Sequence, residues 1–376
     1  MFEAFIVALA SVWADSGFSA LTSGNVIMIV VGLVLLYMAI GRGFEPLLLS
    51  PIAFGCILAN IPKNGFEQPG VMSVIMYGIH HEVFPPLIFL GVGAMTDFGP
   101  LIANPKTLLL GAAAQIGVFV SLMGAMALGF TVQEASAIGI IGGADGPMVL
   151  FTSLMLAPHL FVPISVIAYL YLSLTYAGYP WLLKMLVPKA LRGKDIMFYA
   201  PEVPKSKKFI FILVCCALLC LLLPMAAPLI MSFFLGMAIK EAEIVPYQDL
   251  IENTLLYTGT LMLGLLLGTL CEASTLLNPK VAPLIVLGIL ALAVSGAVGI
   301  LGGYVVYWFK KGDFNPVVGI AGVSCVPTTA KIAQHAAEDE DPFAIVLPVA
   351  MGANIGGVIV SAIACGVFIA TIGMVK

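Results

Sequence analysis

Long, uninterrupted apolar runs recur along the whole chain, and they restrict what it can fold into. Each run is about 20 residues long, the length that a helix needs to cross a hydrocarbon core of about 30 Å. Of the 376 residues, 61% are hydrophobic and only 10% are charged. A soluble chain of this size would need roughly a quarter of its residues charged to cover its surface. We therefore expect an all-α polytopic membrane protein.

The apolar runs predict about ten transmembrane helices from hydropathy alone. Two further stretches, 133–157 and 313–335, are also apolar but are crowded with Gly and Pro, so each could be a re-entrant hairpin or a full crossing. The expected spans are 25–41, 44–61, 84–100, 107–130, 160–183, 207–226, 228–240, 252–270, 282–309 and 343–373, the last of which could hold two segments.

The polar segments indicate how the chain is arranged about the membrane. Residues 1–24 carry Glu3 and Asp15 and lack a basic start, so we expect an interfacial segment and no cleavable signal peptide. Residues 182–208 hold seven of the sixteen basic residues, and the positive-inside tendency therefore predicts a cytoplasmic connector at 184–207. The seven cysteines lack metal-ligand spacing, and we infer neither disulfides nor zinc.

The two sides of this connector share short motifs in the same order, which indicates an internal repeat. We expect a first membrane repeat at 25–183 and a second at 208–376. If each repeat makes an odd number of crossings, an in-plane pseudo-two-fold axis relates them and the repeat is inverted, but hydropathy leaves that number open. The matches are GIIGGADGP at 139–147 with GIAGVSCVP at 319–327, GAMTD at 93–97 with GTLCE at 268–272, NPK at 104–106 with NPK at 278–280, and PIS at 163–165 with PVA at 348–350.

The first Gly/Pro-rich stretch, IIGGADGPMVLF, contains a single carboxylate, Asp145. A carboxylate at the bilayer centre costs about 3 kcal/mol on insertion scales, so it needs a partner. Paired broken helices expose backbone oxygens and amides that bind ions near the midplane. We expect Asp145 to hold sodium or a proton; the alternative is a structural aspartate that caps a half-helix. The residues expected to break the helix are Gly142, Gly143, Gly146 and Pro147.

The second Gly/Pro-rich stretch has Cys325 where the first has Asp145, so its contribution to the site is uncharged. We expect Asn315 and Ser324 to supply oxygen atoms, because hard cations favour carboxylate, amide, hydroxyl and carbonyl oxygens. The residues expected to break this helix are Gly319, Gly322 and Pro327.

Four more polar residues leave alternatives open. Asn354, among glycines, is either a helix-packing contact or an oxygen ligand that faces Asp145. Tyr169 and Tyr171 lie two residues apart, so only one can easily reach a polar centre. Lys331 either extends to a membrane face or holds an anionic substrate at the mouth of the site.

Four stretches resemble the beta subunit of the sodium-translocating decarboxylases, the class that includes oxaloacetate, methylmalonyl-CoA and glutaconyl-CoA decarboxylases. They are IIGGADGP, FNPVVGIAGVSCVPTTAK, GVGAMTDFGPLIANPKTLLLGAAAQ and RGFEPLLLSPIAFGCILANIP. The resemblance runs from about residue 25 to the C-terminus. It implies a membrane translocase subunit that takes carboxybiotin from a biotin-carrier partner, releases carbon dioxide with consumption of a proton, and exports sodium.

The resemblance also implies roles for individual residues. The family's aspartate falls on Asp145 and its functional tyrosine on Tyr171, and either could handle the proton. Lys331 stands where the family has an arginine; the lysine keeps the positive charge for carboxybiotin but loses the bidentate fork. The family's ion-site positions in the second motif fall on Asn315, Gly319 and Ser324, and Asn354 fits a position near the first ion site.

The resemblance finally implies partners. The chain has no biotinylation motif, so covalent biotin would belong to a biotin-carrier and carboxyltransferase (alpha) subunit, and a small membrane subunit of gamma or delta type would complete the complex. Family members form trimers of this subunit within lipid, and we expect no nucleic-acid partner. The rival interpretation is an autonomous sodium/proton antiporter with the same repeats. Which acid or acyl-CoA is decarboxylated is decided in another subunit.

Overall fold

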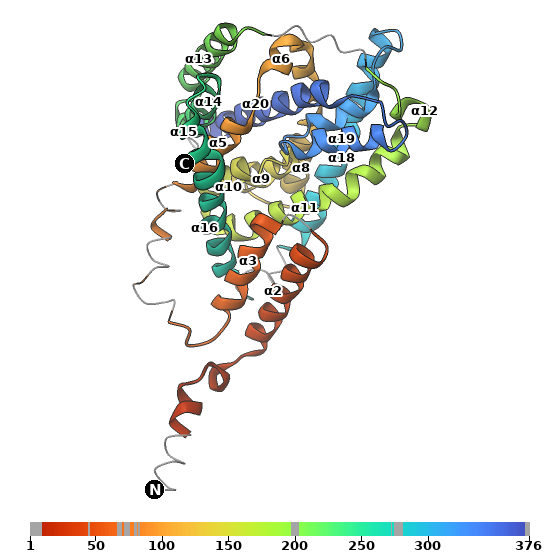
Figure 1. Cartoon of the computed structure of the whole chain (residues 1–376). Helices are drawn as coiled ribbons and strands as arrows, with labels where there is room; N and C mark the ends of the chain where they lie inside the picture. The colour runs from red at the N-terminus through yellow and green to blue at the C-terminus, as the bar shows by residue number, and fades with distance from the viewer. Residues whose placement is uncertain are drawn as a thin grey trace. The chain divides into compact units, whose positions relative to one another are not determined.

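The computed structural model describes residues 10–43, 46–65, 70, 76–78, 81, 83–196, 203–271, 273 and 281–372. Every regular element within these residues is helical (Figure 1), so the expected all-α class is confirmed. Parts of several expectations lie outside the described residues: 1–9 of the N-terminal segment, 44–45 of the span 44–61, 197–202 of the connector, Glu272 of the GTLCE motif, 278–280 of the second Asn-Pro-Lys motif, and 373 of the last span.

Each of the ten expected spans contains a helix, and the last, α20, is one continuous helix. The label η marks short 3-10 helices, except η6, which is a π-helix. In chain order the elements are η1 Gly17–Ala20, α2 Ser23–Gly41, α3 Pro46–Ala59, α5 Phe84–Met95, α6 Gly99–Ala103, η2 Pro105–Thr107, α7 Leu108–Ala114, α8 Ile116–Ala127, α9 Val132–Gly139, η3 Ile140–Gly143, α10 Gly146–Leu156, η4 Pro158–Leu160, α11 Phe161–Leu186, α12 Lys189–Arg192, α13 Lys205–Leu222, η5 Pro224–Ala226, α14 Ala227–Glu241, α15 Val245–Leu250, η6 Ile251–Leu255, α16 Leu256–Thr269, α18 Ala282–Phe309, η7 Pro316–Gly322, α19 Thr328–Glu338 and α20 Leu347–Ile372.

Within the described residues, five helical segments are long and apolar enough to cross a membrane: α2, Pro105–Ala127, Val245–Thr269, α18 and α20. The two arms of α11, which meet at a bend of 51°, make a sixth if they count as one span. The remaining expected spans are shorter or bear charges at one end. The protein is therefore a multi-pass membrane protein.

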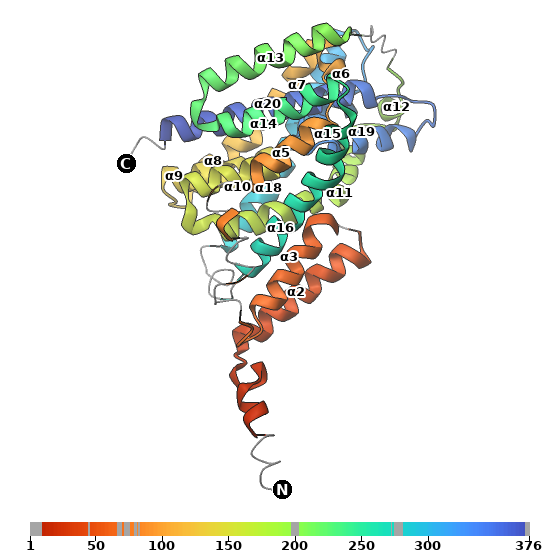
Figure 2. The same ribbon diagram turned by 60° about the vertical axis from the view of Figure 1, so that its left-hand side comes forward.

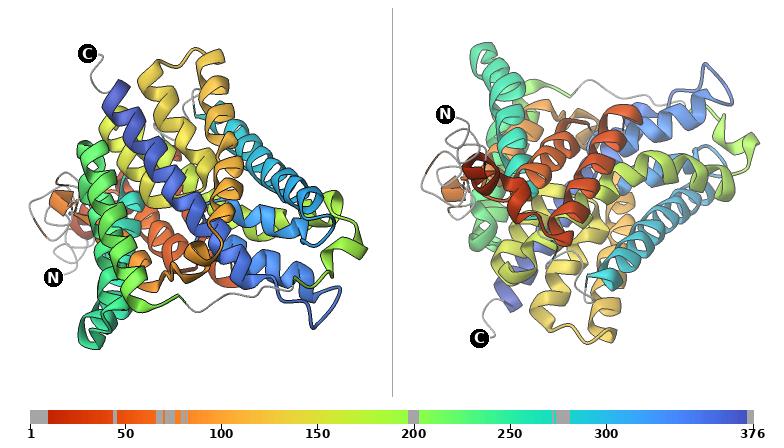
Figure 3. Two further views of the ribbon diagram at one scale, coloured as in Figure 1. Left: turned by 90° about the horizontal axis from the view of Figure 1, so that it is seen from above. Right: turned by 90° about the horizontal axis from the view of Figure 1, so that it is seen from below.

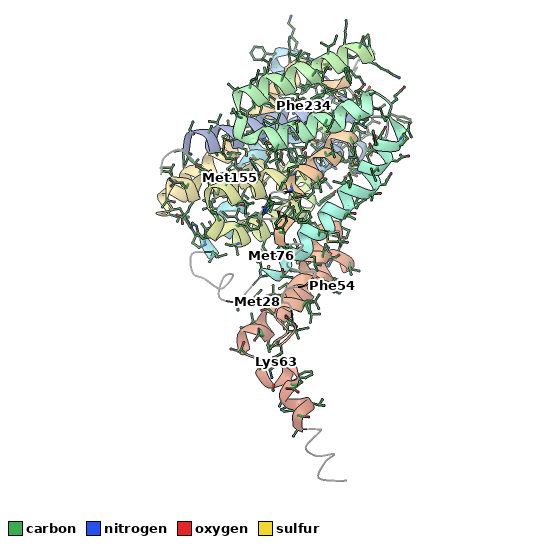
Figure 4. All side chains as sticks on the ribbon, turned by 90° about the vertical axis from the view of Figure 1, so that its left-hand side faces the viewer. Met28, Phe54, Lys63, Met76, Met155 and Phe234 are labelled. Atoms are coloured by element: carbon green, nitrogen blue, oxygen red, sulfur yellow. The ribbon has the colours of Figure 1, made fainter. Side chains whose placement is uncertain are left out.

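Residues 1–84 and 258–282 form one compact unit. In it α2 packs against α3, and the Asn60 side-chain amide donates to the carbonyls of Cys56 and Cys271, both at 2.8 Å. Lys63 donates to the carbonyl of Ala14 and to Ser19 Oγ at 3.1 Å, which ties the start of the described chain to the end of α3 (Figure 4).

Residues 85–257 and 283–376 form the second unit. Helix α20 runs through it between the α13–α14 pair and α18 (Figure 3), and α13 lies along α14 (Figure 2). Phe98 stacks on Phe234 with ring centroids 5.9 Å apart, which packs the loop after α5 against α14. Both units draw on both sides of the connector, so the boundaries 25–183 and 208–376 remain predictions about a repeat.

The first Gly/Pro-rich stretch folds into a helical hairpin, which we call the first hairpin (α9, η3 and α10). Thr131 and Glu134 form a capping box that begins α9. The chain reverses at Ala144, which has a left-handed φ of 55°, and Asp145 then caps α10. Pro147 lies in the first turn of α10, where its missing N–H costs no helical hydrogen bond.

The second Gly/Pro-rich stretch folds into a second hairpin (η7 and α19). Asn315 caps η7, whose seven residues are all buried. The chain is extended at Val323, and α19 starts directly after Pro327. Both expected helix breaks are therefore present.

The two hairpins open toward opposite ends of α11. The open end of the first hairpin, formed by the start of α9 and the end of α10, lies at the start of α11. There His159 Nε2 lies 2.8 Å from Glu134 Oε1. Both ends of the second hairpin, before η7 and after α19, contact the connector that follows α11. Asn315 Nδ2 donates to the carbonyl of Arg192 at 2.7 Å, and Arg192 pairs with Glu340. The inverted repeat remains a prediction.

Glycines allow the helices around the hairpins to touch backbone to backbone. A Cβ on Gly299 of α18 would lie 2.5 Å from the carbonyl oxygen of Gly319 in η7. A Cβ on Gly322 would lie 2.8 Å from the carbonyl carbon of Leu110 in α7. These approaches replace side-chain packing with main-chain contact, as at many membrane helix interfaces.

Replacing Gly299 by alanine tests this contact. The added methyl group would push α18 from the second hairpin, and we expect the free energy of unfolding to fall by about 1–3 kcal/mol, the usual effect of overpacking. Gly178→Ala is the control, because a Cβ there meets nothing within 4 Å. Thermal unfolding of the purified chain in detergent measures both variants, and equal midpoints would contradict the close approach.

Candidate ion site between the hairpin tips

Helix α20 passes both hairpin tips and presents one face to them. Asn354, Gly357 and Ser361 follow each other at spacings of three and four, so they lie on the same side of the helix. Asn354 contacts the second hairpin, and Ser361 contacts the first. The tips meet directly as well, because the Ser324 amide donates to the carbonyl of Gly143 at 3.1 Å.

Asp145 is only 5% exposed and has neutral partners. Its Oδ1 accepts from the amide of Met148 at 3.4 Å, and its Oδ2 accepts from Ser361 Oγ at 2.9 Å. The capping role that the sequence left open is thus present. No ion pair to Asp145 occurs within the described residues, and a buried carboxylate without a cation is strongly disfavoured. The arrangement therefore suits a mobile cation or a proton.

Ser324 contacts the tip of the first hairpin, which carries Asp145. Its backbone amide contacts Gly143, two residues before the aspartate, and its Oγ accepts from Gln115 Nε2 at 2.6 Å. Ser295 Oγ of α18 donates to the carbonyl of Gly142 at 2.6 Å and holds the same tip from the other side. The structure thus brings Ser324 into contact with the first tip, two residues along the chain from Asp145.

Asn354 is completely buried and turns its amide nitrogen toward the second hairpin. Nδ2 donates to the carbonyls of Ala321 and Val323 and to Thr329 Oγ1, at 2.8–2.9 Å. Because carbonyl oxygens can only accept, these contacts determine which end of the amide is nitrogen. Asn354 Oδ1 is left without a hydrogen-bond partner, which is the feature expected of an oxygen that can bind an ion.

Asn315 lies at the other end of η7 and is used differently. Its Nδ2 donates to the carbonyls of Arg192 and Lys194, both at 2.7 Å, and its Oδ1 accepts from the amide of Val317. All of these partners belong to the connector or to η7. The structure therefore joins Asn315 to the connector and shows no hydrogen bond between it and the hairpin tips.

Both tyrosines of α11 approach the first tip, although the sequence favoured only one. A Cβ on Gly146 would lie 2.7 Å from the ring of Tyr169. Tyr171 lines a narrow pocket with Asp145 and Leu292 that leaves no room for a water-sized sphere. The Tyr171 hydroxyl donates to the carbonyls of Ile285 and Leu284 in α18, so its polar end is turned toward α18.

Lys331 lies in the first turn of α19, close to the second tip, and its side chain is exposed. His335 and Glu338 follow at spacings of four and three and are also exposed, with His335 Nδ1 3.3 Å from Glu338 Oε2. We call Lys331, His335 and Glu338 the polar stripe. It runs from the hairpin tip to the foot of α19 at the connector.

The donor chemistry at the tips suits a hard monovalent cation. Within the described residues, no three His, Cys, Asp or Glu side chains cluster as a divalent or transition-metal site would require. What the tips offer is one carboxylate together with hydroxyl, amide and backbone oxygens.

Comparison with known proteins agrees with these features. Residues 24–372 match the family described as the Na+-transporting oxaloacetate decarboxylase beta subunit. The chain belongs to this family. It is 50% identical to the glutaconyl-CoA decarboxylase subunit beta of Acidaminococcus fermentans, over 99% of each chain. It is 49% identical to the carboxybiotin decarboxylase of Malonomonas rubra, over 93% of each chain, and 50% identical to the methylmalonyl-CoA decarboxylase subunit beta of Veillonella parvula, over 98% of each.

Two residues at the tips of this beta subunit were not anticipated from its sequence. Gln115 contacts Ser324, and Ser361 contacts Asp145. A glutamine inside an apolar span was a usable signal, because polar groups in membrane helices face the interior or a cavity. Ser361 gave none, since a serine bonds readily to its own helix, as Ser361 Oγ also does to Val358.

The connector forms hydrogen bonds and an ion pair with both ends of the second hairpin, and we call this set of contacts the connector clamp. Arg192, with a 5% exposed side chain, donates to the carbonyl of Val187 at 2.7 Å and pairs with Glu340. The hydrogen bond that Arg192 donates to the Glu340 carboxylate holds the pKa of Glu340 below its usual range. The stabilisation is therefore present above the ordinary glutamate pKa and is lost as the pH falls through the lowered value. Asp195 and Lys194 add bonds to Ile345 and Gly312.

Arg192→Met should loosen this clamp. The variant leaves Glu340 and the Val187 carbonyl without their donor, so we expect faster hydrogen–deuterium exchange of the amides in 187–196. Lys184→Met is the control, because Lys184 and Asp339 form an exposed pair at 3.7 Å, which contributes little. The same increase in both variants would show that Arg192 has no special role in the connector.

Proposed function

We propose that this chain is the membrane subunit of a sodium pump that decarboxylates carboxybiotin and couples this step, with consumption of a proton, to sodium export. One observation carries the proposal: Asp145 is buried between two hairpin tips with neutral partners only. Membership of the family supports it, and so does the Malonomonas relative, which is named a carboxybiotin decarboxylase.

Sodium would bind at Asp145 of the first hairpin, with oxygens from the second hairpin and from α20. Ser324 is joined to the first tip, and Asn354 Oδ1 is a buried oxygen with no partner, so both fit this role. Asn315 would act at the foot of η7, where it sets the position of the hairpin against the connector. Gly142, Gly143, Gly146 and Pro147 in the first tip and Gly319, Gly322 and Pro327 in the second would allow the backbones to approach the ion.

Sodium and the proton would compete for one charge. A bound sodium ion favours ionised Asp145 in this low-dielectric site, and protonation of the carboxylate weakens the hold on the ion. Tyr171 shares a pocket wall with Asp145 and is the second candidate for proton transfer. Decarboxylation and ion release are coupled if both depend on the same conformational equilibrium of the hairpins.

Carboxybiotin would approach along the polar stripe from the connector end. That end carries the basic residues of the connector, and the positive-inside tendency assigns it to the cytoplasm. Lys331 lies at the inner end of the stripe and offers a positive charge to the carboxylate of carboxybiotin. Removal of carbon dioxide leaves biotin one proton short, which the site must supply.

The remaining activities would belong to partners. Relatives are named as subunits of glutaconyl-CoA and methylmalonyl-CoA decarboxylases, so this chain acts in a complex of several subunits. We propose a biotin-carrier and carboxyltransferase (alpha) subunit, a small membrane subunit of gamma or delta type, and a homotrimer of this chain. Covalent biotin is assigned to the carrier.

Asp145→Asn tests the central assignment. The amide keeps the size of the side chain and one of its two acceptor oxygens but removes the charge, so we expect sodium-dependent turnover of carboxybiotin by the assembled complex to be abolished. Glu134→Gln, at the open end of the same hairpin, should keep sodium dependence. Turnover by Asp145→Asn that still rises with sodium would overturn the assignment. Sodium transport by the purified chain without carboxybiotin would favour the antiporter instead.

Lys331→Met tests the substrate contact. We expect KM for the carboxylated carrier to rise about tenfold or more, since a hydrogen bond to a charged group contributes about 1.5–3 kcal/mol. The sodium concentration for half-maximal rate should change little. Lys331→Arg should restore KM, because it returns the charge. A change in sodium dependence with unaltered KM would instead place Lys331 at the ion site.

A further inference from the structure

Gln115 interrupts the membrane span that precedes the first hairpin. Helix α7 ends at Ala114 and α8 begins at Ile116, so Gln115 lies in the break between them. Its side chain is 1% exposed and points to the place where the two hairpin tips meet. The site is therefore bordered by three interrupted helices, of which the sequence indicated two.

The orientation of the Gln115 amide follows from its partners. Nε2 donates to Ser324 Oγ at 2.6 Å and to the carbonyl of Gly357 at 3.4 Å. Since a backbone carbonyl cannot donate, the nitrogen must be on that side. The oxygen Oε1 consequently faces away from both, and it is buried without a hydrogen-bond partner.

The unpartnered oxygen lies beside the Asp145 site. A Cβ built on Gly143 would lie 2.9 Å from Gln115 Oε1 and 3.7 Å from Ser361 Cβ, so these two atoms border the same point of the first tip. Ser361 Oγ in turn donates to Asp145 Oδ2. A buried oxygen without a donor and a buried carboxylate with neutral partners are each costly, and a cation bound between them would lower both costs.

We propose that Gln115 is a sodium ligand that completes the Asp145 site through its amide oxygen and, through its amide nitrogen, links that site to Ser324. This inference rests on the proposed sodium-pump function. The neutral oxygen also gives the site a preference. An amide oxygen binds a hard cation but is far too weak a base to hold a proton at neutral pH, so Gln115 strengthens sodium binding without strengthening proton binding.

The test is Gln115→Met in the assembled decarboxylase complex. Methionine has nearly the same length and volume but offers no hard oxygen. We expect the sodium concentration for half-maximal carboxybiotin turnover to rise at least tenfold, while the rate at saturating sodium falls much less. The sodium-dependent rise in melting temperature of the purified chain should shift to higher sodium by the same factor.

Gln334→Met is the matched control. Gln334 is also a buried glutamine of this unit, but both ends of its amide are bonded: Nε2 donates to the carbonyl of Ala344, and Oε1 accepts from the amides of Val346 and Leu347. Its replacement should lower the melting temperature at all sodium concentrations and leave the half-maximal sodium concentration unchanged.

The outcomes separate this inference from the function on which it rests. If the unaltered complex turns over carboxybiotin without any dependence on sodium, the proposed function fails. If the unaltered complex depends on sodium and Gln115→Met keeps the same half-maximal concentration and the same sodium-dependent melting shift, only the role of Gln115 is overturned. A lower melting temperature in Gln115→Met without a change in either sodium response would likewise reduce Gln115 to a packing residue.

Discussion

The second unit depends on one backbone hydrogen bond, from the amide of Ser324 to the carbonyl of Gly143. It joins two hairpins that open toward opposite ends of α11, and each hairpin ends a helix inside an apolar interior, where unpaired main-chain groups are costly. The tips bond to each other, Asn354 of α20 donates to two carbonyls of the second tip, and Ser295 of α18 donates to a carbonyl of the first. A tip that lost its counterpart would leave a main-chain group unpaired in an apolar interior, so the proposed ion site needs both hairpins in place.

The charge at this junction determines its chemistry. Asp145 is held by a helix amide and a serine hydroxyl, which stabilise a carboxylate only in part. The other oxygens nearby, on Ser324, Gln115 and Asn354, are neutral. A single carboxylate among neutral oxygens could bind a monovalent ion and still release it, which the proposed pump requires. A second carboxylate would bind the ion more tightly and would also favour protons.

Much of this could be predicted from residues, and the failures have physical causes. Glycine and proline inside apolar runs predicted both helix breaks, and the cost of a buried carboxylate singled out Asp145. The sequence could not decide between a capping role and an ion-binding role for Asp145, because the side chain that caps α10 can also bind an ion. Gln115 and the pairing of Asn315 with the connector were missed, since a sequence does not say which face of a helix meets which neighbour. The close approach of both Tyr169 and Tyr171 to the first tip was missed for the same reason.

The polar stripe on α19 has a consequence for the surrounding bilayer. Lys331, His335 and Glu338 are exposed along a helix whose inner end lies at the hairpin tip, well away from the connector. If this face of an isolated chain met lipid, hydrocarbon tails could not solvate such groups, and water and headgroups would be drawn inward with local thinning of the bilayer. The deformation of the bilayer would disappear when another protein surface covers the polar stripe. Lipid chain length would then influence assembly, because a thicker bilayer would favour the state in which a partner protein covers the polar stripe.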